Sequence, residues 1–331
     1  MDLFKSYILP RLLQWAIVIF VGVTVTFIIP RLLPSDPVQQ TLTRVASMSF
    51  VDPAALESYR ATIEDLYGLR GTPLEQYLAF WRRMLRGDLG PSLSAFPTPV
   101  ISIIKTGLPW TIGLLTTTII LSWLLGIALG TFAGYFPRNR VAQVYDKVLI
   151  TVYPIPYYVL ALILVMLFAY YWPIFPLVGG YSGVQSFSWR YISSIIEHAV
   201  LPATSLILGA TAFRYIMARA LTKTLVTSDF ITYAETATLP RRTILGYITR
   251  NSMLPQITDL GLSLGAMFEG ALVTEVVFGY PGIGYALYTA ILQADFNMIL
   301  GITLFSVVGI ATAALIIDLA YPLFDPRVRY R

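Results

Sequence analysis

Apolar segments long enough to cross a bilayer dominate this sequence. A transmembrane helix needs about 20 consecutive, mostly apolar residues. Six segments meet that need: Leu12–Leu33, Thr111–Tyr135, Val148–Trp172, Val200–Ala220, Leu254–Phe278 and Ile299–Leu319. We therefore predict an all-α, polytopic membrane protein with six transmembrane helices. Pro154 and Pro156 fall inside the third segment, where we expect a kink because proline cannot continue a helix ladder.

The composition agrees with a lipid environment and excludes several functions. Hydrophobic residues make up 56% of the 331 residues and charged residues only 12%. Cysteine is absent, which excludes disulfides, thiol catalysis and cysteine-based metal sites. The one histidine, His198, cannot form a histidine metal cluster and is expected to cap or pack at a helix boundary. In so apolar a chain, the net charge of +5 predicts membrane orientation rather than nucleic-acid binding.

We divide the chain into three parts. Residues 1–33 hold the N-terminus and the first span, residues 34–110 form an insertion, and residues 111–331 form the core with the remaining spans. The insertion is rich in charged residues, proline and glycine, with helical patterns at Pro53–Tyr67 and Pro73–Arg86. The first span is too long for a signal peptide and lacks a small-residue cleavage site, so we expect it to be retained.

Basic residues predict the orientation. Lys and Arg are concentrated in Phe136–Lys147, in the loop at about 221–253 and in the C-terminal tail. The opposite loop Pro173–Ala199 contains only Arg190, and Gly279–Met298 has no basic residue. Because cytoplasmic loops retain Lys and Arg, we predict that both termini are cytoplasmic and that the 34–110 insertion is extracytoplasmic.

No sequence pattern predicts catalysis. A phosphate-binding GxxxxGK[ST] loop is missing, and no nucleophile pattern is recognisable. The carboxylates Glu57, Glu64 and Asp65 fall on a helix that we expect to be solvated. We predict no catalytic residue, no metal and no cofactor on this chain. Transport would then draw its energy from a partner or, in the alternative, from an ion gradient used by a carrier or channel acting alone.

A short amphipathic helix is predicted inside the basic 221–253 loop. Asp229 can cap it, and Phe230, Tyr233 and Ala237 would share one mixed face. Such a helix either docks in a groove of a partner protein or lies on lipid headgroups. The residues alone leave both interpretations open.

Several motifs in a fixed order resemble one family over essentially the whole chain. Tyr233–Ala237 and Asn251–Pro255 resemble the start and the end of the EAA loop of ABC importer permeases. The oligopeptide/dipeptide branch of that family has elements similar to four others here: Tyr7–Gln14 with Pro34–Pro37, Leu85–Ser92, Val276–Gly284 and Asp325–Arg329.

The resemblance implies a heterodimer of two permeases, two cytoplasmic ATPase subunits that bind ATP and Mg, and an extracytoplasmic solute-binding protein, in the prokaryotic inner membrane. Peptides are the implied solutes, with oligosaccharides or glycosides as the alternative. The implied ATPase-coupling residues are Asp229, Phe230, Tyr233, Ala234, Glu235, Thr236 and Ala237.

One departure from the family concerns the end of this coupling helix. The family's glycine and about three neighbours are missing, because Leu239 and Pro240 follow Thr238 directly. We predict a tighter turn at Thr238–Pro240, with Pro240 ending the helix.

Acidic residues in apolar segments are candidates for the solute pathway. Glu269 is our candidate for a group that lines the cavity, with pairing to Arg214 or to a partner permease as the alternative. Glu275 matches a similar acid of the family, and we expect it to have a structural or gating role on the pathway. Asp259 and Asp318 are the other acids of these segments.

Overall fold

The protein is mainly helical in the part described by the computed structural model, which covers residues 7–32, 38–39, 42–43, 53–66, 68–267 and 271–324. The chain divides into two compact units. Unit 1 comprises Met1–Thr111 and Gly282–Leu315, and unit 2 comprises Ile112–Pro281 and Ile316–Arg331. Each unit is described by itself.

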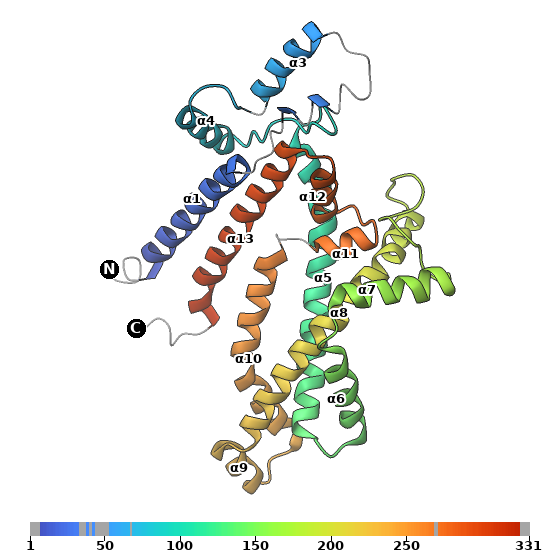
Figure 1. The fold of residues 1–331 in the computed structure, drawn as a ribbon. Helices are drawn as coiled ribbons and strands as arrows, with labels where there is room; N and C mark the ends of the chain where they lie inside the picture. Colours follow the sequence, from blue (N-terminus) through green and yellow to red (C-terminus); the bar gives the residue numbers. More distant parts are fainter. Residues whose placement is uncertain are drawn as a thin grey trace. The chain divides into compact units, whose positions relative to one another are not determined.

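In unit 1, helix α1 (Leu9–Leu32) lies beside α13 (Phe296–Phe324) (Figure 1). Trp15 Nε1–H donates to Thr312 Oγ1 at 3.2 Å. Gly22 lets the two helices approach closely, because an added Cβ would lie 2.5 Å from a methyl group of Val307. The core of the unit joins α13, the first turns of α5 (Val100–Tyr135) and the short apolar helix α12 (Ile283–Leu292), through the buried residues Val100, Ile104, Ile283, Ala290, Met298 and Ile302.

The helical patterns of the insertion are confirmed as α3 (Pro53–Leu66) and α4 (Pro73–Leu85). Helix α4 begins with a capping box, in which the Thr72 N–H donates to Glu75 Oε2 at 2.8 Å and the Glu75 N–H to Thr72 Oγ1 at 3.4 Å. The hydrogen bonds from Thr72 lower the pKa of Glu75. The start of α4 is therefore fixed by its own sequence.

A buried aspartate holds the segment after α4. Asp295 precedes α13, and its Oδ1 accepts the Met298 N–H at 3.1 Å, as a helix cap does. Its Oδ2 accepts hydrogen bonds from the Ser94 N–H and the hydroxyl groups of Ser92 and Ser94. The Leu85–Ser92 element recognised in the sequence therefore ends at Ser92, which is bound to Asp295 within unit 1.

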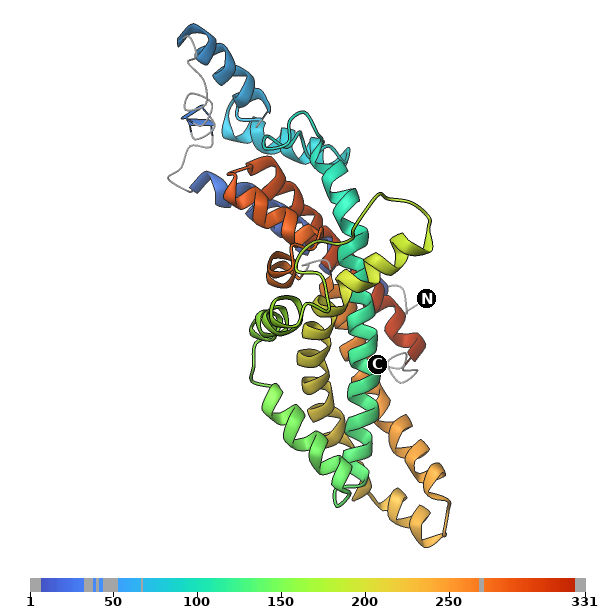
Figure 2. The same cartoon turned by 90° about the vertical axis from the view of Figure 1, so that its right-hand side faces the viewer.

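In unit 2, the predicted kink of the third segment is confirmed. Helix α6 (Arg140–Val152) is followed by α7 (Tyr157–Val165) and the π-helical turn η2 (Met166–Tyr171), and the chain bends by 99° at the break between Val152 and Tyr157. Figure 2 shows the change of direction between the two green helices. Pro154 and Pro156 lie in this break.

Helices α5 and α8 (Trp189–Val226) cross at very short range through glycines spaced by four residues. A Cβ at Gly126 would lie 2.5 Å from Arg214 Cβ, one at Gly130 would lie 2.6 Å from the Tyr215 carbonyl oxygen, and one at Gly134 would lie 2.6 Å from Thr222 Cβ. Small residues at this spacing let membrane helices pack backbone to backbone.

Four described helices are long and apolar enough to cross a membrane, and α6 with α7–η2 makes a fifth if the bent pair is one span. The four are α1, α5, α8 and α13, which match the first, second, fourth and sixth predicted segments. The fifth predicted segment covers the end of α10 (Arg241–Ala266), residues 268–270, which the structure does not describe, and α11 (Leu272–Val277). Polar residues such as Arg250, Gln256 and Asp259 lower the hydropathy of α10. The count of six spans stays a prediction.

Candidate functional site

The predicted amphipathic helix is α9 (Asp229–Thr236), and it is held to unit 2 by its apolar side. Ile231 is fully buried, and Ala234 is buried beside it. Both pack with Ile244 and Ile248 of α10, and the cluster is completed by Tyr135, Leu225 and Val226. Helix α9 therefore rests on the ends of its neighbouring helices.

The other residues of the predicted coupling set form one exposed surface, which we call the α9 surface: Asp229, Phe230, Tyr233, Glu235, Thr236 and Ala237. Tyr233 is 75% exposed, although Ile231, two residues earlier, is 0% exposed. Phe230 and Tyr233 are both exposed on α9, as predicted, whereas Ala237 is the C-cap residue and lies just beyond the helix. Ala234 differs from the rest of the set, because it packs inward.

The beginning of α9 differs from the prediction. Asp229 is the first helical residue, and Ser228 occupies the N-cap position without a side-chain capping bond. The Ser228 hydroxyl instead donates to the carbonyl of Leu225. Asp229 still favours this helix end, because a carboxylate in the first turn interacts well with the helix dipole.

The end of α9 is made by a left-handed residue. Thr238 has φ +55°, and its N–H donates to the Glu235 carbonyl at 2.9 Å. The Leu239 N–H donates to the Ala234 carbonyl at 3.1 Å, which completes a Schellman motif with threonine in the usual glycine position. The tight turn at Thr238–Pro240 is thus confirmed, but the predicted role of Pro240 is wrong. Pro240 is the N-cap residue of α10, and α9 has already ended at Thr236.

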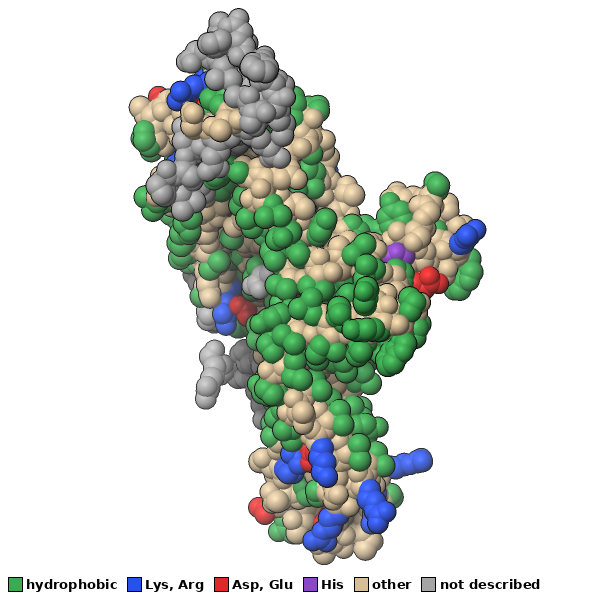
Figure 3. All heavy atoms as spheres, turned by 45° about the vertical axis from the view of Figure 1, so that its right-hand side comes forward, with side chains coloured by type: hydrophobic (Ala, Val, Ile, Leu, Met, Phe, Trp, Pro, Cys, Tyr) green, Lys and Arg blue, Asp and Glu red, His purple; other side chains and the backbone are tan. Residues whose placement is uncertain are grey.

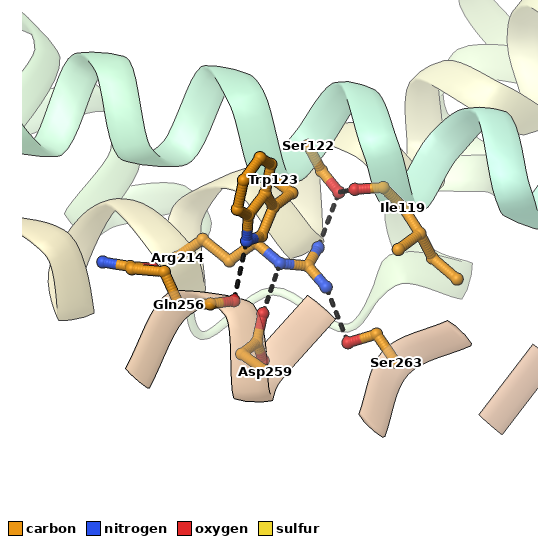
Figure 4. A network of polar contacts seen from close by, with 7 residues as sticks. All are labelled: Ile119, Ser122, Trp123, Arg214, Gln256, Asp259 and Ser263. Atoms are coloured by element: carbon orange, nitrogen blue, oxygen red, sulfur yellow. Dashed lines mark hydrogen bonds and ion pairs between the residues drawn. The ribbon is translucent and has the colours of Figure 1, made fainter. Parts of the chain in front are cut away.

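A buried ion pair crosses the apolar part of unit 2 (Figure 4). Arg214 of α8 is 4% exposed, and its Nε–H donates to Asp259 Oδ2 of α10 at 2.8 Å. The two other guanidinium nitrogens donate to Ser122 Oγ at 2.6 Å and to Ser263 Oγ at 2.8 Å. One arginine therefore joins α5, α8 and α10 through charge-assisted hydrogen bonds.

A second acidic group lies nearer the α9 end of unit 2. Asp146 of α6 accepts hydrogen bonds from Tyr215 and Arg219 of α8. Asp146 was not predicted from the sequence, and neither were the two serines that bind Arg214. The sequence did contain one signal of such contacts. Arg214 is permanently charged and lies inside an apolar segment, where a charge is costly unless it is paired. The structure pairs it with Asp259.

The two candidate pathway acids have different outcomes. Glu269 lies outside the described residues. Glu275 lies on α11, its side chain is fully buried, and its carbonyl accepts the Tyr280 N–H at 2.8 Å. His198 is also buried, with Nδ1 2.7 Å from the Ser194 carbonyl and Nε2 3.3 Å from Ser182 Oγ.

Comparison with known proteins agrees with this architecture. Residues 126–330 match the family of binding-protein-dependent transport system inner membrane components. The oligopeptide transport system permease protein AppB of Bacillus subtilis is 29% identical, over 98% of this chain and 99% of its own length. The dipeptide permease DppB of the same organism is 26% identical, and the oligopeptide permease OppB of Escherichia coli K12 is 27% identical, over similar shares.

Buried charge, glycine-mediated helix packing and several membrane-length helices define a polytopic membrane protein. The chain belongs to the family of binding-protein-dependent transport system inner membrane components. Membership confirms the prediction of a permease subunit of an ABC importer, and with it a transport subunit rather than an enzyme.

Proposed function

We propose that this permease moves peptides across the membrane, as one half of a heterodimer with a second permease. Two cytoplasmic ATPase subunits bind ATP and Mg and supply the free energy, and an extracytoplasmic solute-binding protein delivers the solute. This chain binds no cofactor. Support comes from the relatives, which are named as oligopeptide or dipeptide permeases and align with nearly the whole chain.

The α9 surface is the proposed docking element for an ATPase subunit. The observation that carries this proposal is the contrast between exposed Tyr233 and fully buried Ile231 on an eight-residue helix. A short helix anchored by one side and presenting an aromatic ring on the other suits insertion into a groove. The buried residues Ile231 and Ala234 would transmit the motion of α9 to α8 and α10, which pack together.

Charge supports a cytoplasmic position of α9. In Figure 3, Lys and Arg side chains (blue) gather at the end of unit 2 that carries α9, next to a surface of hydrophobic side chains (green). That end includes Arg138, Arg140, Lys223, Arg241 and Arg242. Positive residues are retained on the cytoplasmic side. Both termini are proposed to lie on that side as well.

Coupling can be tested by exchanging one tyrosine. We expect Tyr233→Ala to reduce ATP-dependent uptake in proteoliposomes by at least about tenfold, because an aromatic residue at the centre of a protein interface can contribute about 2 kcal/mol or more. Tyr247→Ala is the matched control, since Tyr247 is an exposed tyrosine of the same unit on α10. Full uptake by the Tyr233 variant, or uptake without any ATPase subunit, would contradict the proposal.

The solute class can be read from the solute-binding protein. We expect mass spectrometry of that protein, purified with its natural ligand, to identify short peptides. A bound oligosaccharide or glycoside would replace peptides as the solute and leave the coupling proposal intact.

Glu269 and Glu275 are proposed to lie on the solute pathway, Glu275 in a structural or gating role. We expect Glu269→Gln to change the relative uptake of charged and neutral peptides, since a lost carboxylate alters the charge of a lining. An unchanged uptake profile would remove Glu269 from the pathway.

A further inference from the structure

Helix α4 of the insertion lies against the apolar segment of α1. The rings of Trp81 and Phe20 stack with centroids 5.8 Å apart, and those of Tyr77 and Phe27 meet edge to face at 5.1 Å. The hydroxyl groups of Tyr77 and Thr24 are 2.7 Å apart. All three contacts on α1 fall inside its candidate membrane span, Leu9–Ile29. Helix α4 therefore packs against the part of α1 that is long and apolar enough to cross a membrane.

Next to Tyr77 and Trp81, which contact α1, helix α4 presents an exposed stripe of leucines. Leu74, Leu78 and Leu85 are 66%, 53% and 76% exposed. Residues spaced by four and seven positions lie on one face of a helix. Three leucines in one stripe on a helix rich in polar residues indicate a surface that something apolar covers.

Helix α1 also exposes hydrophobic side chains. Ile17, Val21, Ile28 and Ile29 of α1 are exposed hydrophobic residues of a membrane-spanning helix. Trp81, which stacks on Phe20 of α1, lies between Leu78 and Leu85 at helical spacing, so the leucine stripe adjoins the contact with α1.

Basic residues flank the stripe at one end of α4. Arg82 and Arg83 lie in its last turn, and Arg86 is its C-cap residue. Arg82 and Arg86 are exposed. A long arginine side chain can keep its guanidinium at the membrane surface while its stem lies over apolar groups. Guanidinium groups bind phosphate through paired hydrogen bonds.

We propose that α4 is an interfacial helix. The stripe of Leu74, Leu78 and Leu85 lies among lipid acyl chains, and Arg82 and Arg86 bind phosphates of the lipid headgroups. The leaflet is the one that holds the Phe20–Arg31 half of α1, which is extracytoplasmic in the topology proposed above. The low overall hydrophobicity of α4, with separate apolar and charged sides, is that of a helix lying in the membrane surface rather than crossing it.

The absence of cysteine makes this proposal easy to test in the full chain. Spin labels are attached to Leu78→Cys and, as the matched position on the charged flank of α4, to Glu75→Cys. The labelled permease is placed in nanodiscs of phosphatidylethanolamine and phosphatidylglycerol. The accessibility of each spin label is then measured separately to oxygen, which concentrates in lipid, and to a water-soluble nickel chelate.

We expect the ratio of oxygen to nickel accessibility to be on the order of tenfold higher at Leu78 than at Glu75, because the stripe lies below the headgroups. Equal ratios at the two positions would place the stripe in water and overturn the proposal. Shielding of Leu78 from both agents would also overturn it, because a protein partner would then cover the stripe.

The arginines are tested with the same label. Arg82→Gln with Arg86→Gln is expected to lower the ratio at Leu78 by at least about twofold, since two phosphate contacts near the membrane surface are lost. Arg190→Gln, an exposed arginine of unit 2, is the control. An unchanged ratio in the double variant would remove the headgroup contacts from the proposal.

Discussion

Arg214 and Asp259 form a buried ion pair between α8 and α10, with 2.8 Å between Nε and Oδ2. Their side chains are only 5% and 18% exposed. Ser122 and Ser263 accept hydrogen bonds from the two other guanidinium nitrogens, so each nitrogen of the arginine has a partner. The pair ties the helix that follows α9 to the helix that precedes it.

Removing the acid of this pair should be costly. We expect Asp259→Ala to lower the free energy of unfolding by about 3–5 kcal/mol, because an arginine is left charged and buried without its counterion. Thermal unfolding of the purified permease in detergent measures the effect. The double variant Arg214→Met with Asp259→Leu should recover most of the loss, since well-packed apolar residues commonly replace a buried pair. A double variant as unstable as Asp259→Ala would contradict this explanation.

The contact between α5 and α8 predicts a sharp difference between two glycines of the same helix. Gly130→Ala should destabilise the protein by about 1–3 kcal/mol, because its Cβ would lie 2.6 Å from a backbone carbonyl oxygen. Gly113→Ala meets no atom within 4 Å and should be neutral or stabilising by up to about 1 kcal/mol. Equal thermal midpoints of the two variants would show that the helices can separate without cost.

Much of this fold is predictable from sequence because lipid imposes a simple length rule. The first, second, fourth and sixth segments are found as helices because their apolar runs are long enough to outweigh the few charged residues in them, such as Arg214 in the fourth. The fifth is harder. Its helix α10 carries the polar residues Arg250, Gln256 and Asp259. A hydropathy average does not show that Asp259 is paired with Arg214. Helix α12 was missed because it is apolar but too short to span.

The candidate site was also predictable only in part. Tyr233 and Phe230 were predicted to share a mixed face because helical spacing fixes which residues lie together. The anchor at Ile231 and the bond network of Asp146 depend on contacts between distant parts of the chain. Spacing along the sequence carries no information on such contacts. The position of Thr238 was predicted as a turn, but its left-handed backbone was not, because threonine rarely adopts it.

Replacing Thr238 should strengthen the end of α9. Thr238→Gly is expected to stabilise this turn by about 1 kcal/mol, since glycine adopts φ +55° without a clash at Cβ. Hydrogen exchange of the Leu239 amide, which donates to the Ala234 carbonyl, measures the turn directly. Thr236→Gly, inside the last helical turn, should have the opposite effect. Faster exchange in the Thr238 variant would mean that the threonine side chain stabilises the turn.

Asp295 offers the last prediction, on unit 1. Its carboxylate caps α13 through the Met298 N–H and holds Ser92 and Ser94 by three further hydrogen bonds. Asp295→Ala removes all four acceptor contacts at a residue that is 1% exposed, so we expect a loss of about 3 kcal/mol in the free energy of unfolding. Ser94→Ala removes the hydroxyl contacts with Asp295 and Ser92 but keeps the backbone bond to Asp295, and its expected loss is about 1 kcal/mol.

Limited proteolysis of the Leu85–Ser92 segment distinguishes the two variants of Asp295 and Ser94. With Asp295 replaced, the segment loses its anchor on α13, and cleavage there should become faster than in the unchanged protein. With Ser94 replaced, Ser92 still donates to Asp295, and cleavage should change little. Equal cleavage of both variants would assign the hold on this segment to the Asn297 side chain, which donates to the Pro91 carbonyl at 3.0 Å.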